Sequence, residues 1–160
     1  MRYLALIFLT TCNPARMISP THHYDVYVGN EFSDIQKQEI NNAFLEWERS
    51  TNDSVSFSFI GGKNYSNPLI VVELIPSSQI KEIFNHHTIG RTEWRGFDSY
   101  IVISSSLNDR DFQQVILHEI GHAIGLDHGD NETAMGANTE LASMHLTQKD
   151  LNSFYYIFGN

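Results

Sequence analysis

The sequence predicts an α/β domain in which helices pack on a mostly parallel sheet. Segments with strand character and a segment of helical periodicity follow one another in the order strand, helix, strand, strand, and this order implies right-handed crossover connections. Two of the strand segments, LIVVELI and YIVIS, are nearly continuous apolar runs, which is typical of strands covered on both faces. With 160 residues, the chain has the length of one domain with its own core.

The first strand and the helix after it are marked by their periodicity. HHYDVYVG alternates apolar and polar residues, as a half-buried strand does. A helix is predicted to begin after Ser33, because Ser33 and Gln36 form the pattern of a capping box. The apolar residues of this helix recur at i, i+3, i+4 and i+7, so they share one face. They are Ile40, Ala43, Phe44 and Trp47.

The remaining elements follow in order along the chain. SVSFSFIGG alternates apolar residues with serines, which predicts a strand with one covered face. Residues 89–94 lie between the two apolar runs and have turn residues on either side, so they predict an edge strand. Asn108 caps a second long helix through DRDFQQVILHEIGHAIG, and Thr147 caps a C-terminal helix with Asp150 at its third position. The apolar face of that last helix comprises Leu151, Phe154, Tyr155 and Phe158.

The segment HEIGHAIGLDHGDNETAM concentrates side chains that bind metals. His118 and His122 lie one helical turn apart, so both imidazoles project from one face and can reach a single ion. Glu119 is rotated away from the metal but lies near a water bound to it. Gly125 permits a positive φ that ends the helix, so His128 can return with a third nitrogen. Three neutral nitrogens leave open the fourth position that a catalytic zinc site requires.

These five positions match the signature HExxHxxGxxH, and the segment closes on Met135. Two histidines alone also occur in helices that hold no metal, whereas the full signature rarely arises by chance. The pattern resembles the metzincin zinc endopeptidases, in which the methionine of the Met-turn lies beneath the metal. The order of elements over residues 22–160 is similar to the matrixin-like branch. The resemblance implies a metzincin-like catalytic domain, with a five-stranded mixed and twisted sheet, an edge strand, an active-site helix and a C-terminal helix.

The resemblance also implies a zinc-dependent endopeptidase. Members of this group hydrolyse peptide bonds through a metal-activated water and a glutamate general base. The expected site consists of the catalytic residue Glu119, the metal ligands His118, His122 and His128, and the supporting residues Gly125 and Met135. A peptide or protein substrate is expected to lie extended and antiparallel to the edge strand at residues 89–94. Residues 136–138 are expected to shape the pocket beyond the scissile bond.

One catalytic zinc ion is expected. Matrixins have a serine after the third histidine, where this chain has Gly129, and their histidine and aspartate series for a second, structural zinc is not evident. Ala137 stands two positions after Met135, where astacins and serralysins have a tyrosine ligand. A competing interpretation is an envelope-tethered binding protein that keeps the zinc-site fold without proteolysis. The complete ligand set and Glu119 favour the enzyme, because a binding protein has no chemical need for a base.

The charge of the chain limits its partners. The formal net charge is −9, from 19 acidic residues against 10 lysines and arginines, so a phosphate backbone would be repelled and nucleic acid is not expected as a partner. Two acidic pairs near turns could recruit a calcium ion, but the sequence does not show that their oxygens converge. The pairs are Asp109 with Asp111, and Asp127 with Asp130. The protein is expected to be a monomer.

The N-terminal sequence MRYLALIFLTTC predicts export. Its apolar run is too short to span a bilayer, and LTTC resembles the lipobox of bacterial lipoproteins, whose cysteine is lipidated after cleavage. Residues 1–11 are therefore expected to be an export signal, residues 12–21 a tether and residues 22–160 the peptidase domain. Lipid on Cys12 would be the only attachment to the membrane. Simple secretion and an N-terminal strand with an inert thiol are the alternatives.

Overall fold

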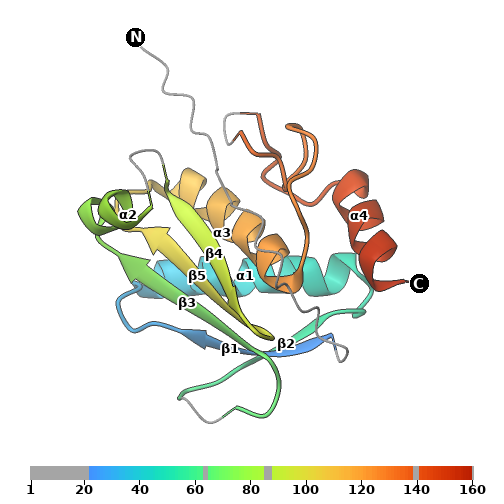
Figure 1. Ribbon diagram of the computed structural model, residues 1–160, viewed down its shortest axis with the longest axis horizontal. Coiled ribbons are helices and arrows are strands. Elements are labelled where there is room, and N and C mark those ends of the chain that lie inside the picture. The colour runs from blue at the N-terminus through green and yellow to red at the C-terminus, as the bar shows by residue number, and fades with distance from the viewer. Residues whose placement is uncertain (1–21, 63–64, 85–87, 139–140, 160) are drawn as a thin grey trace.

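The computed structural model describes residues 22–62, 65–84, 88–138 and 141–159. In this part of the chain, a five-stranded sheet carries two long helices on one face, and the C-terminal helix lies to one side of these two (Figure 1). This architecture confirms the predicted fold class.

The sheet is mixed, and its strand order is β2-β1-β3-β5-β4. Its strands are β1 (His23–Val28), β2 (Ser56–Phe59), β3 (Leu69–Ile75), β4 (Gly90–Arg95) and β5 (Asp98–Ser104). The pairs β1–β2, β1–β3 and β3–β5 are parallel, whereas β4 runs antiparallel to β5. Strand β4 is therefore the edge strand predicted from residues 89–94, and within the described residues its outer edge has no partner strand.

The three long helices begin where their capping residues predicted. In α1 (Asp34–Ser50) the capping box between Ser33 and Gln36 is complete, and the four predicted apolar residues are buried. Helix α3 (Asp109–Ile124) begins after Asn108, whose side chain accepts a hydrogen bond from the backbone N–H of Asp111 at 3.0 Å. Helix α4 (Gln148–Phe158) begins with a second complete capping box. No helix in the described ranges is both long and apolar enough to cross a membrane.

One short helix was not predicted from the sequence. Helix α2 (Ser77–Ile83) lies between β3 and β4, and it has no side-chain cap. Pro76 precedes its first residue, where its missing N–H is not needed. Ile80 is fully buried, so this apolar side chain packs α2 against the rest of the domain. A helix of seven residues is too short to produce a clear periodicity, because it contains only about two turns.

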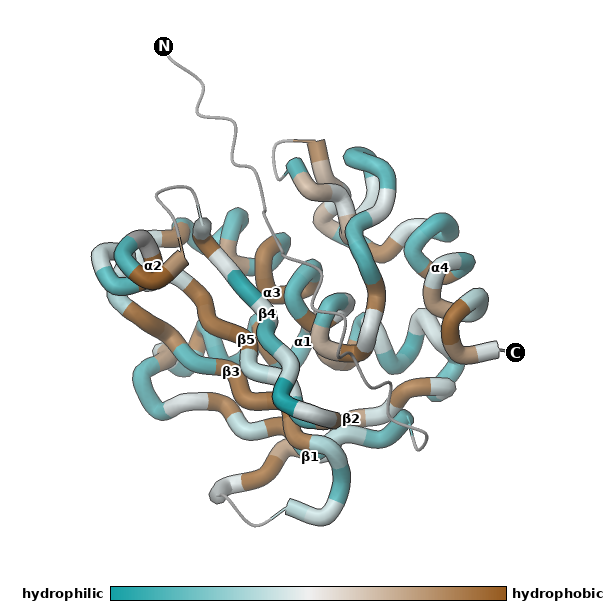
Figure 2. The backbone as a smooth tube through the Cα atoms, viewed as in Figure 1, coloured by the Kyte–Doolittle hydropathy of each residue, from teal (hydrophilic) through white to brown (hydrophobic). Residues whose placement is uncertain are grey.

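The core lies between the sheet and the two helices α1 and α3, and apolar segments of the strands run through it (Figure 2). Ile101 and Ile103 of β5 point into this core and are fully buried. The prediction that both apolar runs are covered on both faces was wrong for β5, because Tyr100 and Val102 on the opposite face are only half-buried. It was right for the first half of β3, where four successive residues are buried. In the described part of the chain, the two helices α1 and α3 lie on the same face of the sheet (Figure 1).

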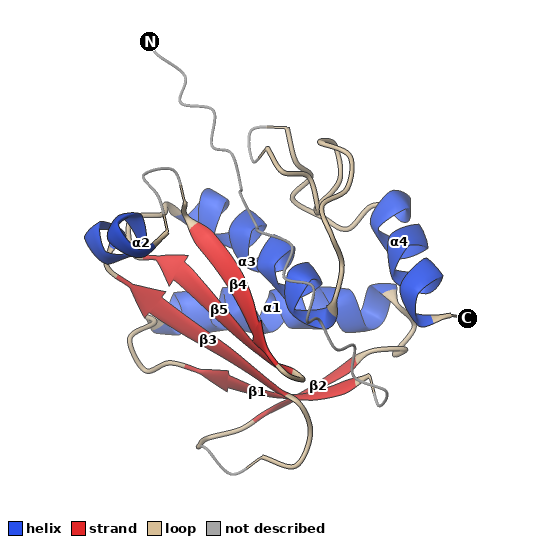
Figure 3. Ribbon diagram, viewed as in Figure 1, coloured by secondary structure: helices blue, strands red, loops and turns tan. Residues whose placement is uncertain are grey.

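A long segment without regular structure joins α3 to α4 (Figure 3). Its described parts are residues 125–138 and 141–147. This segment returns to α3, where its His128 joins two histidines of the helix.

Candidate metal centre

The C-terminal end of α3 turns the chain back toward the helix. Gly125 has a φ of 119°, which a residue with a side chain rarely adopts. Its N–H bonds the carbonyl of His122 at 2.9 Å, and the N–H of Leu126 bonds the carbonyl of Gly121 at 2.8 Å. These bonds satisfy the last carbonyls of the helix. The turn predicted from Gly125 is therefore present, and it directs the chain toward His128.

The three predicted histidines come together in one cluster. His118 and His122 project from α3, and His128 comes from the returning segment. The centroids of their rings lie 4.6 Å, 4.7 Å and 5.2 Å apart, and one nitrogen from each ring lies within 4.8 Å of the others. His118 and His122 are buried, and His128 is half-buried. Among the described residues, this is the only group of three or more candidate metal ligands.

Hydrogen bonds fix the orientation of two of these rings. Nδ1 of His118 lies 2.9 Å from the carbonyl oxygen of Ala134, and Nδ1 of His122 lies 2.7 Å from that of Leu126. A carbonyl oxygen only accepts, so each Nδ1 carries the proton and each Nε2 presents a lone pair. Burial lowers the pKa of His118 to about 4 and also lowers the pKa of His128. His118 and His128 are therefore neutral at pH 7, and three histidine nitrogens are a donor set that fits a zinc ion.

The predicted Met-turn residue packs against the helical turn between the two histidines. Met135 is buried, and its carbonyl accepts a hydrogen bond from the N–H of Gly129 at 2.8 Å. A Cβ atom on Gly121 would overlap the sulfur of Met135 and lie 2.9 Å from the ring of Trp47. Gly121 thus allows Met135 to approach α3 closely. This explains a glycine between the histidines, where a helix alone would favour alanine.

Asp150 has a role that the sequence did not reveal. It was predicted only as a capping residue of α4, and its carboxylate does accept hydrogen bonds from the N–H and hydroxyl of Thr147, both at 2.8 Å. The same buried carboxylate accepts hydrogen bonds from the backbone N–H of Ala134 at 3.1 Å and of Met135 at 3.0 Å. Because the carbonyl of Ala134 accepts the proton of His118, Asp150 ties α4 to the Met-turn and hence to a candidate ligand.

Glu119 lies on α3 beside the cluster and is completely buried. Its Oε2 accepts a hydrogen bond from the hydroxyl of Thr92 on β4 at 2.6 Å, whereas its Oε1 has no hydrogen-bond partner among the described residues. Burial raises the pKa of Glu119 to about 7. A cation held by the histidines would lower this pKa, since it favours the carboxylate form. The arrangement provides a base with one oxygen available for a proton.

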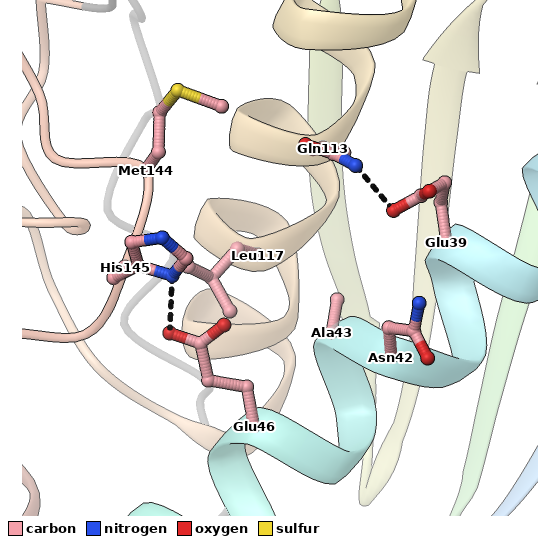
Figure 4. A pocket seen from close by; sticks show the side chains of 8 residues that line it. All are labelled: Glu39, Asn42, Ala43, Glu46, Gln113, Leu117, Met144 and His145. Atoms are coloured by element: carbon pink, nitrogen blue, oxygen red, sulfur yellow. Dashed lines mark hydrogen bonds and ion pairs between the residues drawn. The ribbon is translucent and has the colours of Figure 1, made fainter.

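Helices α1 and α3 hold the chain that follows the Met-turn. A cavity of about 210 Å³ lies between the two helices and that chain, on the side of α3 that faces α1 (Figure 4). Here Glu46 accepts a hydrogen bond from the N–H of Leu146 at 2.8 Å and lies 3.5 Å from Nδ1 of His145. The side-chain amide of Gln114 donates to the carbonyl of Ala142 at 2.7 Å. These contacts fix residues 142–146 to the two helices.

In the described part of the chain, neither of the acidic pairs belongs to a group of three or more candidate metal ligands. Asp130 pairs with Lys149 at 2.6 Å, and Asp111 accepts a hydrogen bond from the side chain of Asn108 at 2.8 Å. Their carboxylates do not gather with two other candidate ligands.

Solved structures of other proteins share this fold. Archaemetzincin from Methanopyrus kandleri is similar with a TM-score of 0.52 and 12% identity, over 83% of this chain and 93% of that one. Myroilysin has a TM-score of 0.53 and 11% identity, over 91% and 96% of the two chains. Metalloproteinase-II from Bacteroides fragilis has a TM-score of 0.51 and 12% identity, over 92% of this chain and 56% of that one. At these identities the likeness is one of fold.

The fold matches that of metzincin catalytic domains. The matrixin family model matches residues 22–159, which is nearly the whole of the described chain. The chain belongs to the matrixin family of peptidases. Comparison with curated protein sequences finds no match.

Proposed function

We propose that the protein is a zinc-dependent endopeptidase with one catalytic ion. His118, His122 and His128 would hold the zinc, and Glu119 would act as the general base. The observation that carries this proposal is the convergence of three histidines beside a buried carboxylate, one oxygen of which has no hydrogen-bond partner among the described residues. Gly125 and Met135 support the site, because one directs His128 back to the helix and the other packs against α3.

The chemistry follows from these groups. Bound zinc supplies a Lewis acid that polarises the scissile carbonyl and lowers the pKa of water toward about 7. Oε1 of Glu119 accepts the proton of the attacking water and then delivers it to the leaving amine. The fixed Nδ1 protons of His118 and His122 keep their other nitrogens available as ligands throughout.

The substrate in this proposal is a peptide or protein in extended conformation. The outer edge of β4 has no partner strand in the described ranges, so its backbone groups are available to pair with an antiparallel peptide. Strand β4 also contacts the site directly, because Thr92 bonds Glu119. Residues 136–138, which follow the Met-turn, would line the pocket beyond the scissile bond.

We further propose that the protein is exported and acts as a monomer. Residues 1–21, which hold the expected signal, Cys12 and the tether, lie outside the described residues. Removal of residues 1–11 and lipidation of Cys12 would make the lipid the only membrane attachment, and simple secretion is the alternative. Mass spectrometry of the native protein would decide, since an intact Met1 or an unlipidated terminus would exclude the anchor.

The test of the enzymatic function is proteolysis itself. The purified protein, loaded with one equivalent of zinc, should cleave members of a broad peptide library, and mass spectrometry would identify the cleaved bonds. The same protein treated with a chelator should lose this activity and regain it with zinc. Zinc binding without any zinc-dependent cleavage would favour the competing function, a tethered binding protein with the zinc-site fold.

A further inference from the structure

We propose that Thr92 is a positioning residue that holds the base Glu119 in its working orientation. This proposal rests on the proposed endopeptidase function. Thr92 belongs to the edge strand β4, which lies alongside α3 (Figure 1). Glu119 lies on α3, so the hydrogen bond between the two residues joins the strand to the helix.

The contact is close and lies away from solvent. The hydroxyl of Thr92 is 2.6 Å from Oε2 of Glu119 and 3.0 Å from the backbone carbonyl oxygen of the same residue. Thr92 is 4% exposed and Glu119 is 0% exposed, so water does not compete for either acceptor. A hydrogen bond from a hydroxyl to a buried carboxylate is stronger than one between neutral groups. The single hydroxyl proton of Thr92 is directed at Oε2, the nearer of the two acceptors, so the carboxylate of Glu119 is held against β4.

A glycine on the same strand makes room for this arrangement. A Cβ atom on Gly90 would overlap Cγ1 of Val115 and lie 3.0 Å from Oε1 of Glu119. Gly90 and Thr92 are two positions apart, so they face the same side of the strand. The strand therefore leaves space where Glu119 lies and supplies a hydroxyl at the next position on that face.

This arrangement distinguishes the two oxygens of the carboxylate. Oε2 is engaged by Thr92, and Oε1 is buried without a hydrogen-bond partner in the described part of the chain. A proton taken from water is then received by Oε1, while Oε2 continues to accept from Thr92 in both protonation states. Valine at position 92 would have nearly the same shape but would leave the carboxylate free to rotate. The strand that pairs with substrate would also orient the base.

The first test compares variants of Thr92 in the zinc-loaded protein. Thr92→Val should lower kcat by about 10-fold to 100-fold with KM changed less than about 2-fold, because a misplaced catalytic group costs rate rather than binding. Thr92→Ser keeps the hydroxyl and should restore most of the lost rate. Zinc content should stay at one equivalent in both variants. A Thr92→Val protein with the wild-type kcat would overturn the proposal.

Ser99 on the neighbouring strand β5 provides a matched control. Its buried hydroxyl donates to the carbonyl of Ala123 on α3 at 3.0 Å, away from Glu119. Ser99→Ala therefore removes a strand-to-helix hydrogen bond of the same kind. It should lower the melting temperature but leave kcat near the wild-type value. An equal loss of kcat in Ser99→Ala and Thr92→Val would mean that Thr92 only fastens the strand to the helix.

A second test needs no activity. A double-mutant cycle compares the melting temperatures of four metal-free proteins. They are the wild type, Thr92→Val, Glu119→Ala and the double variant. If the hydroxyl acts through the carboxylate, Thr92→Val should lower the melting temperature less in the Glu119→Ala background than in wild type. Equal shifts in both backgrounds would overturn the proposal. If the wild type cleaves no peptide, the proposed function is wrong, and this cycle still decides whether Thr92 holds Glu119.

Discussion

The carboxylate of Asp150 accepts a hydrogen bond from the backbone N–H of Met135 at 3.0 Å. This bond joins the first turn of α4 to the Met-turn, and the adjacent bond to Ala134 extends the connection to His118. The C-terminal helix thus contributes to the candidate metal centre without supplying one of its histidines. A capping residue that is buried and shared with another loop holds two parts of the fold together.

Asp150→Ala should destabilise the protein and weaken zinc binding. Loss of the carboxylate leaves buried N–H groups of the Met-turn without an acceptor, at a cost of roughly 2–4 kcal/mol in the free energy of unfolding. Zinc affinity should fall about 10-fold to 100-fold, as for other groups that orient a ligand. Urea unfolding and zinc titration would measure the two effects. Ser33→Ala, which removes the cap of α1, should cost only about 1 kcal/mol and leave zinc affinity unchanged.

Glu119→Gln should separate catalysis from metal binding. The amide has nearly the same size as the carboxylate but does not accept the proton of water, so the rate of peptide hydrolysis should fall about 10²-fold to 10⁴-fold. Zinc content and melting temperature should stay near wild type. His122→Ala should instead lose both zinc and activity, because it removes a ligand. Wild-type cleavage by Glu119→Gln would show that the assigned base is wrong.

The purified protein should hold one zinc ion per chain. The described residues contain one group of candidate ligands, and elemental analysis after mild dialysis should give close to one equivalent. His128→Ala should weaken binding strongly, since only two ligands remain. Two tightly bound zinc ions would contradict the single site. Zinc should also raise the melting temperature of the wild type, because a ligand that binds only the folded state stabilises it.

Gly121→Ala should be destabilising, although alanine is the better helix former. In an exposed helix the change would stabilise by about 1 kcal/mol, but here the new methyl group meets Met135 and Trp47. Overpacking of this kind costs about 1–3 kcal/mol. Gly62→Ala is the control, because a Cβ atom at Gly62 meets nothing within 4 Å. Unfolding curves that show Gly121→Ala to be as stable as wild type would refute the close packing of the Met-turn on α3.

Asp25 should make stability depend on pH in the acid range. Hydrogen bonds from the side chain of Asn67 and from the backbone N–H groups of Ser66 and Asn67 lower the pKa of Asp25 below its usual value of 3.8. The group is depressed in the folded state, so its stabilisation is present above pH 3.8 and is lost as the pH falls through the folded pKa. The free energy of unfolding of Asp25→Asn, followed from pH 6 to about pH 2, should decline less than that of wild type. If the free energy of unfolding declines equally in the two proteins, Asp25 does not contribute to the acid sensitivity.

Much of the structure could be predicted from the sequence, because it depends on interactions between residues close together in the chain. The capping residues fixed where α1, α3 and α4 begin, since a cap bonds residues within one turn of itself. The spacing of His118 and His122, with Gly125 after them, placed the candidate ligands, because helix geometry and the permitted φ of glycine act over a few residues. The order of elements and the histidine signature were enough to predict the fold and the family.

Only the tertiary structure decided which distant groups meet. The hydrogen bond between Thr92 and Glu119 spans 27 positions, and the one between Asp150 and Met135 spans 15. Neither hydrogen bond produces a periodic pattern in the sequence, because its two partners meet only when a strand or a loop packs against a helix. The contact of Gly121 with Met135 and the exposure of one face of β5 have the same origin. Periodicity reports which side of an element is apolar, whereas packing decides what lies against it.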